Sequence, residues 1–199
     1  MRKILLLFVS VLIIFSSCGS TNVRRVDSNR QIDLSGYWND VDVRIVCDAL
    51  INDCLSSQRV DQEIRSKGRT PTVIVGNFRN ESAEHIDTEI ISSIMETTIF
   101  NTGRLNFVAG GDVRDEIRVE RQDQQNYSSA STTSAVHNET GADFMLTGTV
   151  RSIVDREGNR TVRTYFVSAT LTSIETNERL WMGQYNEIKK VITTPNTRL

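Results

Sequence analysis

The chain has 199 residues and a formal net charge of -2, which leaves room for one domain with extensions. Hydrophobic residues make up 38% and charged residues 24%, so most of the chain can bury a core. The 23 Lys and Arg against 25 Asp and Glu give no basic surplus for binding nucleic acid. Two His and three Cys are too few for a His/Cys-rich zinc module.

The amino terminus has the pattern of a secretory signal. Two basic residues precede an apolar stretch from Ile4 to Phe15, which is too short for the about 20 apolar residues that span a bilayer. Small residues stand directly before Cys18 and resemble the bacterial lipobox, in which the cysteine sulfur receives diacylglycerol. We therefore predict a lipoprotein signal peptide over residues 1–17 and a lipidated Cys18. The alternative is an ordinary secretory signal with an incidental cysteine.

The residues after Cys18 predict where the protein is anchored and how far its domain reaches. No Asp stands directly after Cys18, and by resemblance to the sorting rule of enteric bacteria this predicts the outer membrane, with the domain in the periplasm. Residues 18–35 are polar and read as a flexible, lipid-anchored tether. Because the seventeen residues 19–35 reach at most about 60 Å when fully extended, the domain over residues 36–199 is expected to stay close to its membrane.

A helical pattern begins at Asn39, which is suited to cap a helix with Asp42 at the third helical position. Apolar residues then recur on one face, at Val43, Val46, Cys47, Leu50 and Cys54. Seven helical residues separate two Cα atoms by about 10.5 Å, beyond the roughly 7 Å that a disulfide tolerates. We interpret Cys47 and Cys54 as two core thiols. A disulfide remains open if the helix breaks before Cys54.

The middle of the chain alternates short strands with helices. The run Thr72–Val75 predicts a strand covered on both faces, and a helix that begins near Ile86 ends at Gly103 as its C-cap. A strand is expected over Leu105–Ala109.

A polar helix is expected next, capped by Asp112, and the Gln-, Asn- and Ser-rich residues 122–134 predict an exposed loop. A short helix then runs to Gly141.

The last third has a period of two. Alternating residues begin at Phe144, at Tyr165 and at Trp181, with turn clusters at Asp155–Asn159 and Glu175–Glu178. This pattern predicts an antiparallel three-strand meander. The whole is therefore expected to be one α/β (α+β) domain.

Catalytic motifs for phosphate binding, acyl transfer or zinc proteolysis do not occur in the sequence, which favours a binding protein without cofactor over an enzyme. Four residues around one turn, Glu81, Glu84, His85 and Asp87, are potential metal ligands, but helix caps and first-turn charges explain them better. Tyr37 and Trp38 open the domain, either as exposed interaction aromatics or packed against the first helix.

Several segments together resemble the LpoB-type lipoproteins, outer-membrane activators of bifunctional (class A) penicillin-binding proteins. The resemblance lies in residues 36–42, 53–55, 68–76, 80–88, 141–148 and 180–181. It implies a mixed sheet flanked by helices, similar to the amino-terminal domain of TolB and to CsgG-type proteins. It also implies a non-catalytic protein that binds the synthase and stimulates peptidoglycan synthesis allosterically. The family-motif positions are Trp38, Asn80, His85, Asp87, Asp143 and Gly148.

The tether departs from this resemblance, because the best-known enteric members have a far longer disordered stretch after the lipidated cysteine. The partner must therefore approach the outer membrane itself or differ from the enteric one. The alternative function is a CsgG-like secretion or envelope-assembly accessory. Three segments are expected to contact a partner, namely Ser35–Asp42, Asn77–Asp87 and Gln122–Ser134.

Overall fold

The computed structural model describes residues 24–27 and 30–195 of the chain. The chain divides into two units, and the second, Gln31–Leu199, holds the folded domain. The predicted signal peptide and Cys18 lie outside the described residues. Along the domain the elements are α2 (Asp40–Ser56), α3 (Gln58–Ser66), β1 (Thr72–Asn80), α4 (Thr88–Thr102), β2 (Asn106–Phe107), α5 (Gly111–Tyr127), β3 (Phe144–Glu157), β4 (Arg160–Ser173), β5 (Arg179–Tyr185) and β6 (Lys189–Thr193).

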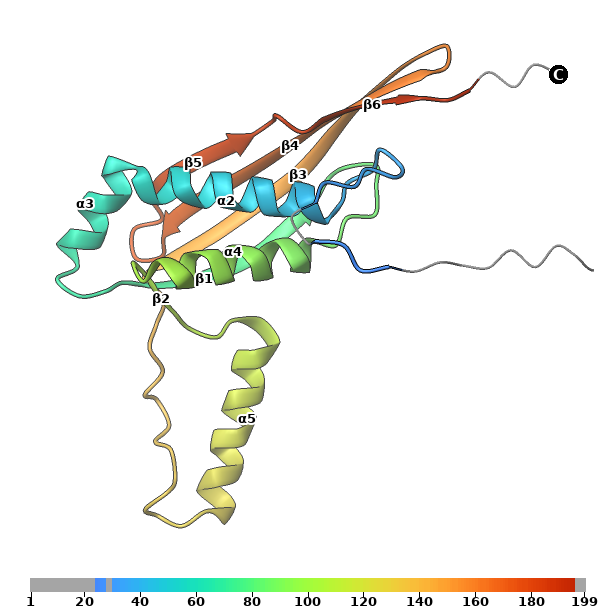
Figure 1. Cartoon of the computed structure of the whole chain (residues 1–199). Helices are drawn as coiled ribbons and strands as arrows, with labels where there is room; N and C mark the ends of the chain where they lie inside the picture. The colour runs from blue at the N-terminus through green and yellow to red at the C-terminus, as the bar shows by residue number, and fades with distance from the viewer. Residues whose placement is uncertain (1–23, 28–29, 196–199) are drawn as a thin grey trace, which may run out of the picture. The chain divides into compact units, whose positions relative to one another are not determined.

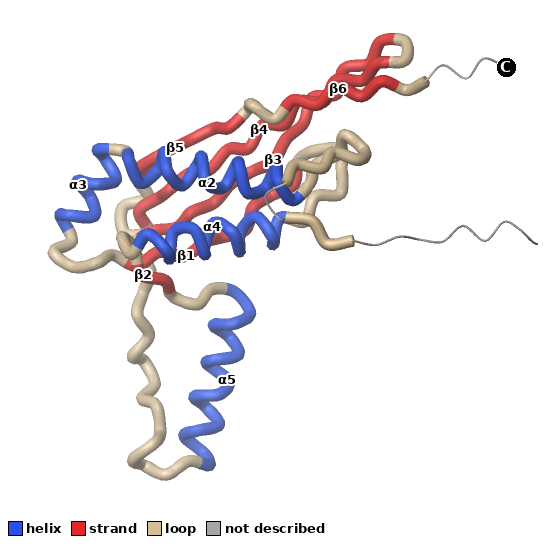
Figure 2. Tube along the Cα trace, in the orientation of Figure 1, coloured by secondary structure: helices blue, strands red, loops and turns tan. Residues whose placement is uncertain are grey.

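The six strands form one mixed sheet. Its order is β2-β1-β3-β4-β5, with β6 paired to the opposite end of β4 from β5 (Figure 2). Strand β1 runs parallel to β2 and β3, whereas β3, β4 and β5 form the predicted antiparallel meander. The expected fold class, a mixed sheet flanked by helices with a C-terminal meander, is therefore confirmed.

Helix α2 begins and packs as the sequence predicts. The side chain of Asn39 accepts hydrogen bonds from two backbone N–H groups, and the side chain of Asp42 accepts one from the backbone N–H of Asn39, which completes a capping box. The predicted apolar face is buried. Cys47 and Cys54 are free and buried, and burial raises the pKa of each thiol to about 12, so their interpretation as core thiols is confirmed.

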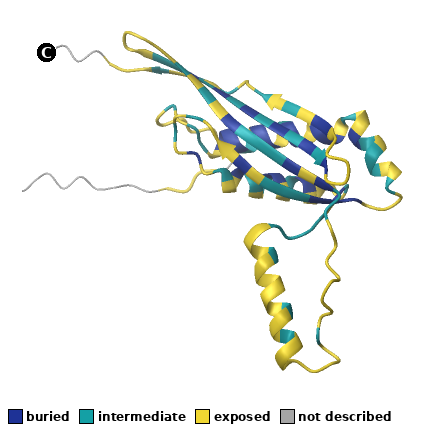
Figure 3. Ribbon diagram, turned by 180° about the vertical axis from the view of Figure 1, so that it is seen from behind, coloured by how far each residue is buried: buried dark blue, intermediate teal, exposed yellow. Residues whose placement is uncertain are grey.

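Helices α2 and α4 cover one face of the sheet, and the core lies between the two layers (Figure 1). The other face carries no helix in the described part of the domain (Figure 3). The expectation that Thr72–Val75 is covered on both faces is therefore wrong. Ile74 lies on the helix-free face, where the backbone of Gly110 packs against its side chain. A Cβ on this glycine would stand 2.7 Å from the Ile74 side chain.

The polar segment between β2 and β3 differs most from expectation. Gly110 caps α5 and Asp112 lies within its first turn, so the predicted cap is displaced. The helix continues to Tyr127, through the first part of the predicted loop, and the expected short helix before Gly141 is absent from residues 128–143. Helix α5 buries no residue and packs against no other helix or strand of the described domain (Figure 3). Its sequence therefore has no apolar stripe from which the length of the helix could be predicted.

Candidate functional site

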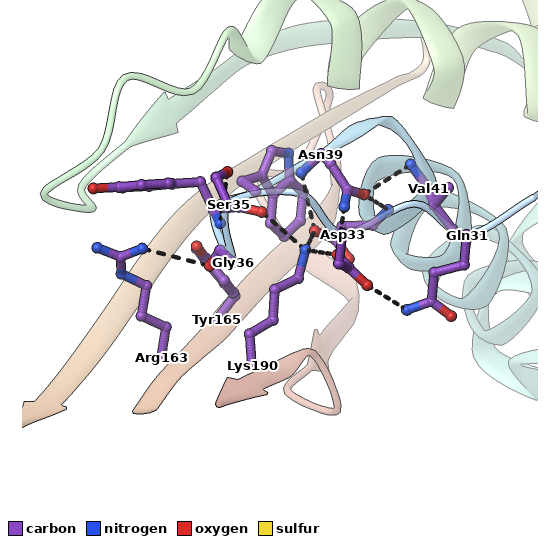
Figure 4. Close-up of polar contacts among 12 residues, drawn as sticks. Gln31, Asp33, Ser35, Gly36, Asn39, Val41, Arg163, Tyr165 and Lys190 are labelled. Carbon is purple, nitrogen blue, oxygen red and sulfur yellow. Dashed lines mark hydrogen bonds and ion pairs between the residues drawn. The ribbon is translucent and has the colours of Figure 1, made fainter. Parts of the chain in front are cut away.

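The chain enters the domain through a cluster of buried charges, which Figure 4 shows. The Lys190 Nζ atom lies 2.5 Å from Asp42 Oδ2 and 2.7 Å from Asp33 Oδ1, and it donates to the Tyr37 carbonyl at 2.9 Å. Only 9% of the Lys190 side chain and 4% of the Asp42 side chain are exposed. Hydrogen bonds from Lys190 and Gln31 lower the pKa of Asp33. Residues 31–35, which the sequence assigned to the tether, thus lie on the domain.

A second buried pair continues this cluster toward the turn before α4. The Arg163 Nε atom lies 3.3 Å from Glu84 Oε1, and each side chain is 8% exposed. The Tyr165 hydroxyl donates to both Glu84 oxygens at 2.8 Å, and burial together with this contact raises the pKa of Tyr165. The Arg163 guanidinium also lies 3.8 Å from the centre of the exposed Tyr37 ring. These pairs join residues 31–39, which lead into the domain (the entry segment), to the sheet.

Trp38 packs beside the same cluster of charges. Its ring meets the Tyr165 ring edge-on with the centroids 5.2 Å apart, and its backbone N–H donates to Glu84 Oε2 at 3.3 Å. The packed alternative is therefore the observed one for Trp38. Its main aromatic partner is on β4 rather than on the first helix.

Three of the other family-motif positions lie at the turn between β1 and α4. The Asn80 side chain donates to the Glu84 carbonyl at 2.7 Å and so closes the turn. Asp87 caps α4 by accepting from the Glu89 backbone N–H at 3.0 Å. His85 is exposed at the surface. Asn80 and Asp87 therefore shape the turn.

The last two motif positions hold strands together. Asp143 accepts from the Thr72 backbone N–H at 2.7 Å and lies 2.8 Å from Arg69. Burial opposes ionisation of Asp143, but these two partners together lower its pKa. At Gly148 a Cβ would stand 2.1 Å from the Phe78 ring, so only glycine allows this contact.

The four potential metal ligands have other partners or face water. Glu81 pairs with Arg151 at 2.7 Å, while Glu84 and Asp87 make the contacts given above. Among the described residues no group of three or more His, Cys, Asp and Glu side chains is placed to hold a metal ion.

The helix-free face of the sheet is the site that sequence reasoning missed. Arg79, Arg151 and Arg179 line a shallow hollow there, and all three are exposed. Hydroxyl groups of β3 and β4 form its floor, from Thr147, Thr149, Ser168, Thr170 and Thr172. The alternation of β3 and β4 carries the signal, because most of the residues between the core positions of Leu146–Val150 and Val167–Ser173 are Thr or Ser. Such a face presents guanidinium and hydroxyl donors, which are the groups that bind carboxylates.

The structure brings two of the three expected contact segments together. Ser35–Asp42 meets Asn77–Asp87 through the hydrogen bond between Trp38 and Glu84, and the second segment supplies Arg79 to the helix-free face. The third segment, Gln122–Ser134, lies on α5 and the residues after it. In the described part of the chain, no helix has the length and apolar character needed to span a bilayer.

Comparison with known proteins places this domain in a family. A family model described as "Peptidoglycan-synthase activator LpoB" matches residues 42–186. No curated protein matches the chain.

Similar solved structures include two LpoB C-terminal domains. The domain from Escherichia coli has 13% identity and a TM-score of 0.44, with 77% of this chain and 99% of that chain covered. The domain from Salmonella enterica has 12% identity and a TM-score of 0.40, with 73% and 97% covered. Lipoprotein GNA1162 from Neisseria meningitidis has 19% identity and a TM-score of 0.39, with 64% and 88% covered. Because the family match spans more than half of its residues, the chain belongs to the LpoB family of peptidoglycan-synthase activators.

Proposed function

We propose that this protein is an outer-membrane lipoprotein that binds a class A penicillin-binding protein and stimulates it without catalysing a reaction. The family match over residues 42–186 is the observation that carries this proposal. The buried charges of the domain fit a non-catalytic role, since Asp42, Glu84, Arg163 and Lys190 are paired with one another or with the entry segment. Such pairs position the chain and leave no free acid or base at this cluster.

The helix-free face of the sheet is the surface that we assign to the synthase. Its three arginines outnumber the acids beside them, since Glu81 alone pairs with Arg79 and Arg151. Among the described residues, the Arg179 guanidinium donates a hydrogen bond only to the Met182 sulfur, at 3.7 Å. Exposed charges of one sign raise the rate at which an oppositely charged partner docks. The occupant of this face is therefore expected to be an acidic surface of the synthase.

The proposed anchor sets where this encounter takes place. Lipidation of Cys18 fixes one end of the tether, and contacts of Asp33 with Lys190 fix the other end on the domain. The twelve residues between Cys18 and Gln31 span at most about 45 Å when fully extended. The synthase is therefore expected to reach toward the outer membrane to meet the domain.

A binding measurement with charge-reversal variants tests the proposal. The full chain is titrated into a purified class A penicillin-binding protein, and the variant Arg151→Glu/Arg179→Glu is compared with Arg156→Glu, an exposed arginine near the tip of the β3–β4 hairpin. We expect the double variant to lose at least about tenfold in affinity and the control to bind as the wild type. Equal affinity of the double variant and the control for the synthase would show that the helix-free face is not the binding surface. Absence of binding by the wild type would favour the alternative role as an envelope-assembly accessory.

A further inference from the structure

Strand β1 has an open edge on the side away from β3. It pairs with β2 at only two positions, Thr72 with Asn106 and Val73 with Phe107, whereas its pairing with β3 continues to Asn80. The last contact on this side is the Val108 N–H to the Val73 carbonyl at 3.5 Å. Alternate residues of a parallel strand direct their backbone groups to opposite neighbours, so Val75 faces the same edge as Val73. No strand of the described chain pairs with β1 there.

An apolar groove lies directly beside this edge. Val75 and Phe107 contribute from the sheet, Phe100 from α4 and Val113 from the first turn of α5. The rings of Phe100 and Phe107 lie 6.4 Å apart, and 66% of Phe100 and 56% of Val113 are exposed to water. Exposed strand edges are ordinarily blunted by charge, by proline or by a covering segment. Here the edge instead leads into an aromatic pair, in which Phe107 is partly buried and Phe100 is exposed.

One carboxylate lines the same groove without a partner. The Glu96 side chain of α4 makes no ion pair or hydrogen bond with another described residue. Partial burial raises its pKa. A cation that arrived with a ligand would therefore find an acceptor already placed beside the apolar groove.

We propose that this edge binds an extended peptide segment of a partner protein, which adds as a strand beside β1 at Val75. Its backbone supplies hydrogen bonds to the edge, one apolar side chain enters between Phe100 and Phe107, and a neighbouring Lys or Arg pairs with Glu96. Backbone pairing gives affinity, and the groove with its carboxylate selects the alternate side chains. This groove is a different site from the helix-free face with Arg79, Arg151 and Arg179 (the arginine face), which we assign to the synthase. Either assignment can therefore be wrong without affecting the other.

A displayed library of random peptides, selected on the full chain, tests this inference. We expect enriched peptides to alternate apolar and polar residues and to carry a basic residue. Hydrogen exchange with the best synthetic peptide should slow at the Val75 amide. Phe100→Glu and Glu96→Lys should each weaken binding about tenfold or more, whereas Ile90→Glu, an exposed site on the same helix outside the groove, should leave it unchanged.

Three outcomes would overturn the inference. Peptides that bind Phe100→Glu as well as the wild type would place the site elsewhere, and a library with no enriched peptide would leave the groove without this class of ligand. If the Val75 amide exchanges slowly without peptide, and only at protein concentrations at which the chain dimerises, the edge binds a second copy of the chain instead. Circular dichroism of each variant confirms that these surface changes leave the fold intact.

Discussion

The hydroxyl of Tyr165 donates to both carboxylate oxygens of Glu84, at 2.8 Å each, and so joins the middle of the sheet to the turn before α4. The same carboxylate pairs with Arg163 and accepts from the Trp38 backbone N–H. One buried acid therefore connects the entry segment, a turn and β4. This joint holds the part of the chain that leads to the predicted membrane anchor.

Removing the Tyr165 hydroxyl tests this joint. We expect Tyr165→Phe to lower the free energy of unfolding by about 2 kcal/mol, because Glu84 loses a donor where only 8% of its side chain meets water. Urea denaturation measures the effect. The control is Tyr185→Phe, whose hydroxyl makes an exposed 3.4 Å contact with Glu187 and should matter little. Equal losses in the two variants would contradict the importance of the Glu84 contact.

Removing the Lys190 charge is expected to lower the stability of the domain more than removing the Tyr165 hydroxyl does. We expect Lys190→Met to destabilise the domain by about 3 kcal/mol, because the buried Asp42 side chain would lose its cationic partner. The exposed neighbour provides a matched control, and Lys189→Met should change stability by less than about 0.5 kcal/mol. Addition of Asp42→Asn to Lys190→Met should recover part of the loss. A Lys190→Met protein as stable as wild type would show that the entry segment is not held by charge.

Gly148 is a family-motif position that packing explains. An alanine Cβ there would meet the Phe78 ring at 2.1 Å and the Ser168 carbonyl at 2.5 Å. We expect Gly148→Ala to lower the unfolding free energy by about 2 kcal/mol through overpacking. Gly141→Ala is the control, because no atom lies within 4 Å of a Cβ built there. Thermal unfolding measures the effect. Equal midpoint temperatures for Gly148→Ala and Gly141→Ala would contradict the overpacking explanation.

The sequence predicted those elements whose signals are local. The capping box of Asn39, the buried face of α2, the left-handed Gly103 at the end of α4 and the C-terminal meander all follow from neighbouring residues. Helix α3 was missed because only Val60 is buried among its nine residues, which leaves no apolar stripe. Strand β3 continues to Glu157, through most of the predicted turn at Asp155–Asn159, since hydrogen bonding along the hairpin with β4 outweighs the polar composition.

The site was less predictable, because its contacts join residues far apart in the chain. Asp33 and Lys190 are 157 positions apart, and β6, which carries Lys190, was not predicted at all. The arginine face likewise draws Arg79, Arg151 and Arg179 from three different strands. No spacing rule brings such residues together before the strand order is known.

Acid titration gives a prediction with a definite sign. The Thr72 N–H and Arg69 together lower the pKa of Asp143 below its ordinary value of about 3.9 despite the opposing effect of burial. Its charged form therefore stabilises the fold above that value, and this contribution is lost as the pH falls through the lower folded-state pKa. We expect Asp143→Asn to be less stable than wild type at pH 7, with the difference shrinking below about pH 4.

The check is urea denaturation at a series of pH values. Asp155→Asn, an exposed carboxylate on the β3–β4 hairpin, serves as the control and should stay within about 0.5 kcal/mol of wild type. A stability difference for Asp143→Asn that stays constant down to acid would show that the carboxylate charge has no role there.

The central claim is that the protein stimulates a peptidoglycan synthase through the arginine face of its sheet. The most direct measurement is the glycan polymerisation rate of a purified class A penicillin-binding protein in liposomes, with and without the full lipidated chain. The account predicts a faster rate with the wild-type protein, no increase with Arg151→Glu/Arg179→Glu, and a full increase with Arg156→Glu. A rate that does not change on addition of the wild-type protein, or that rises equally with all three, would contradict it.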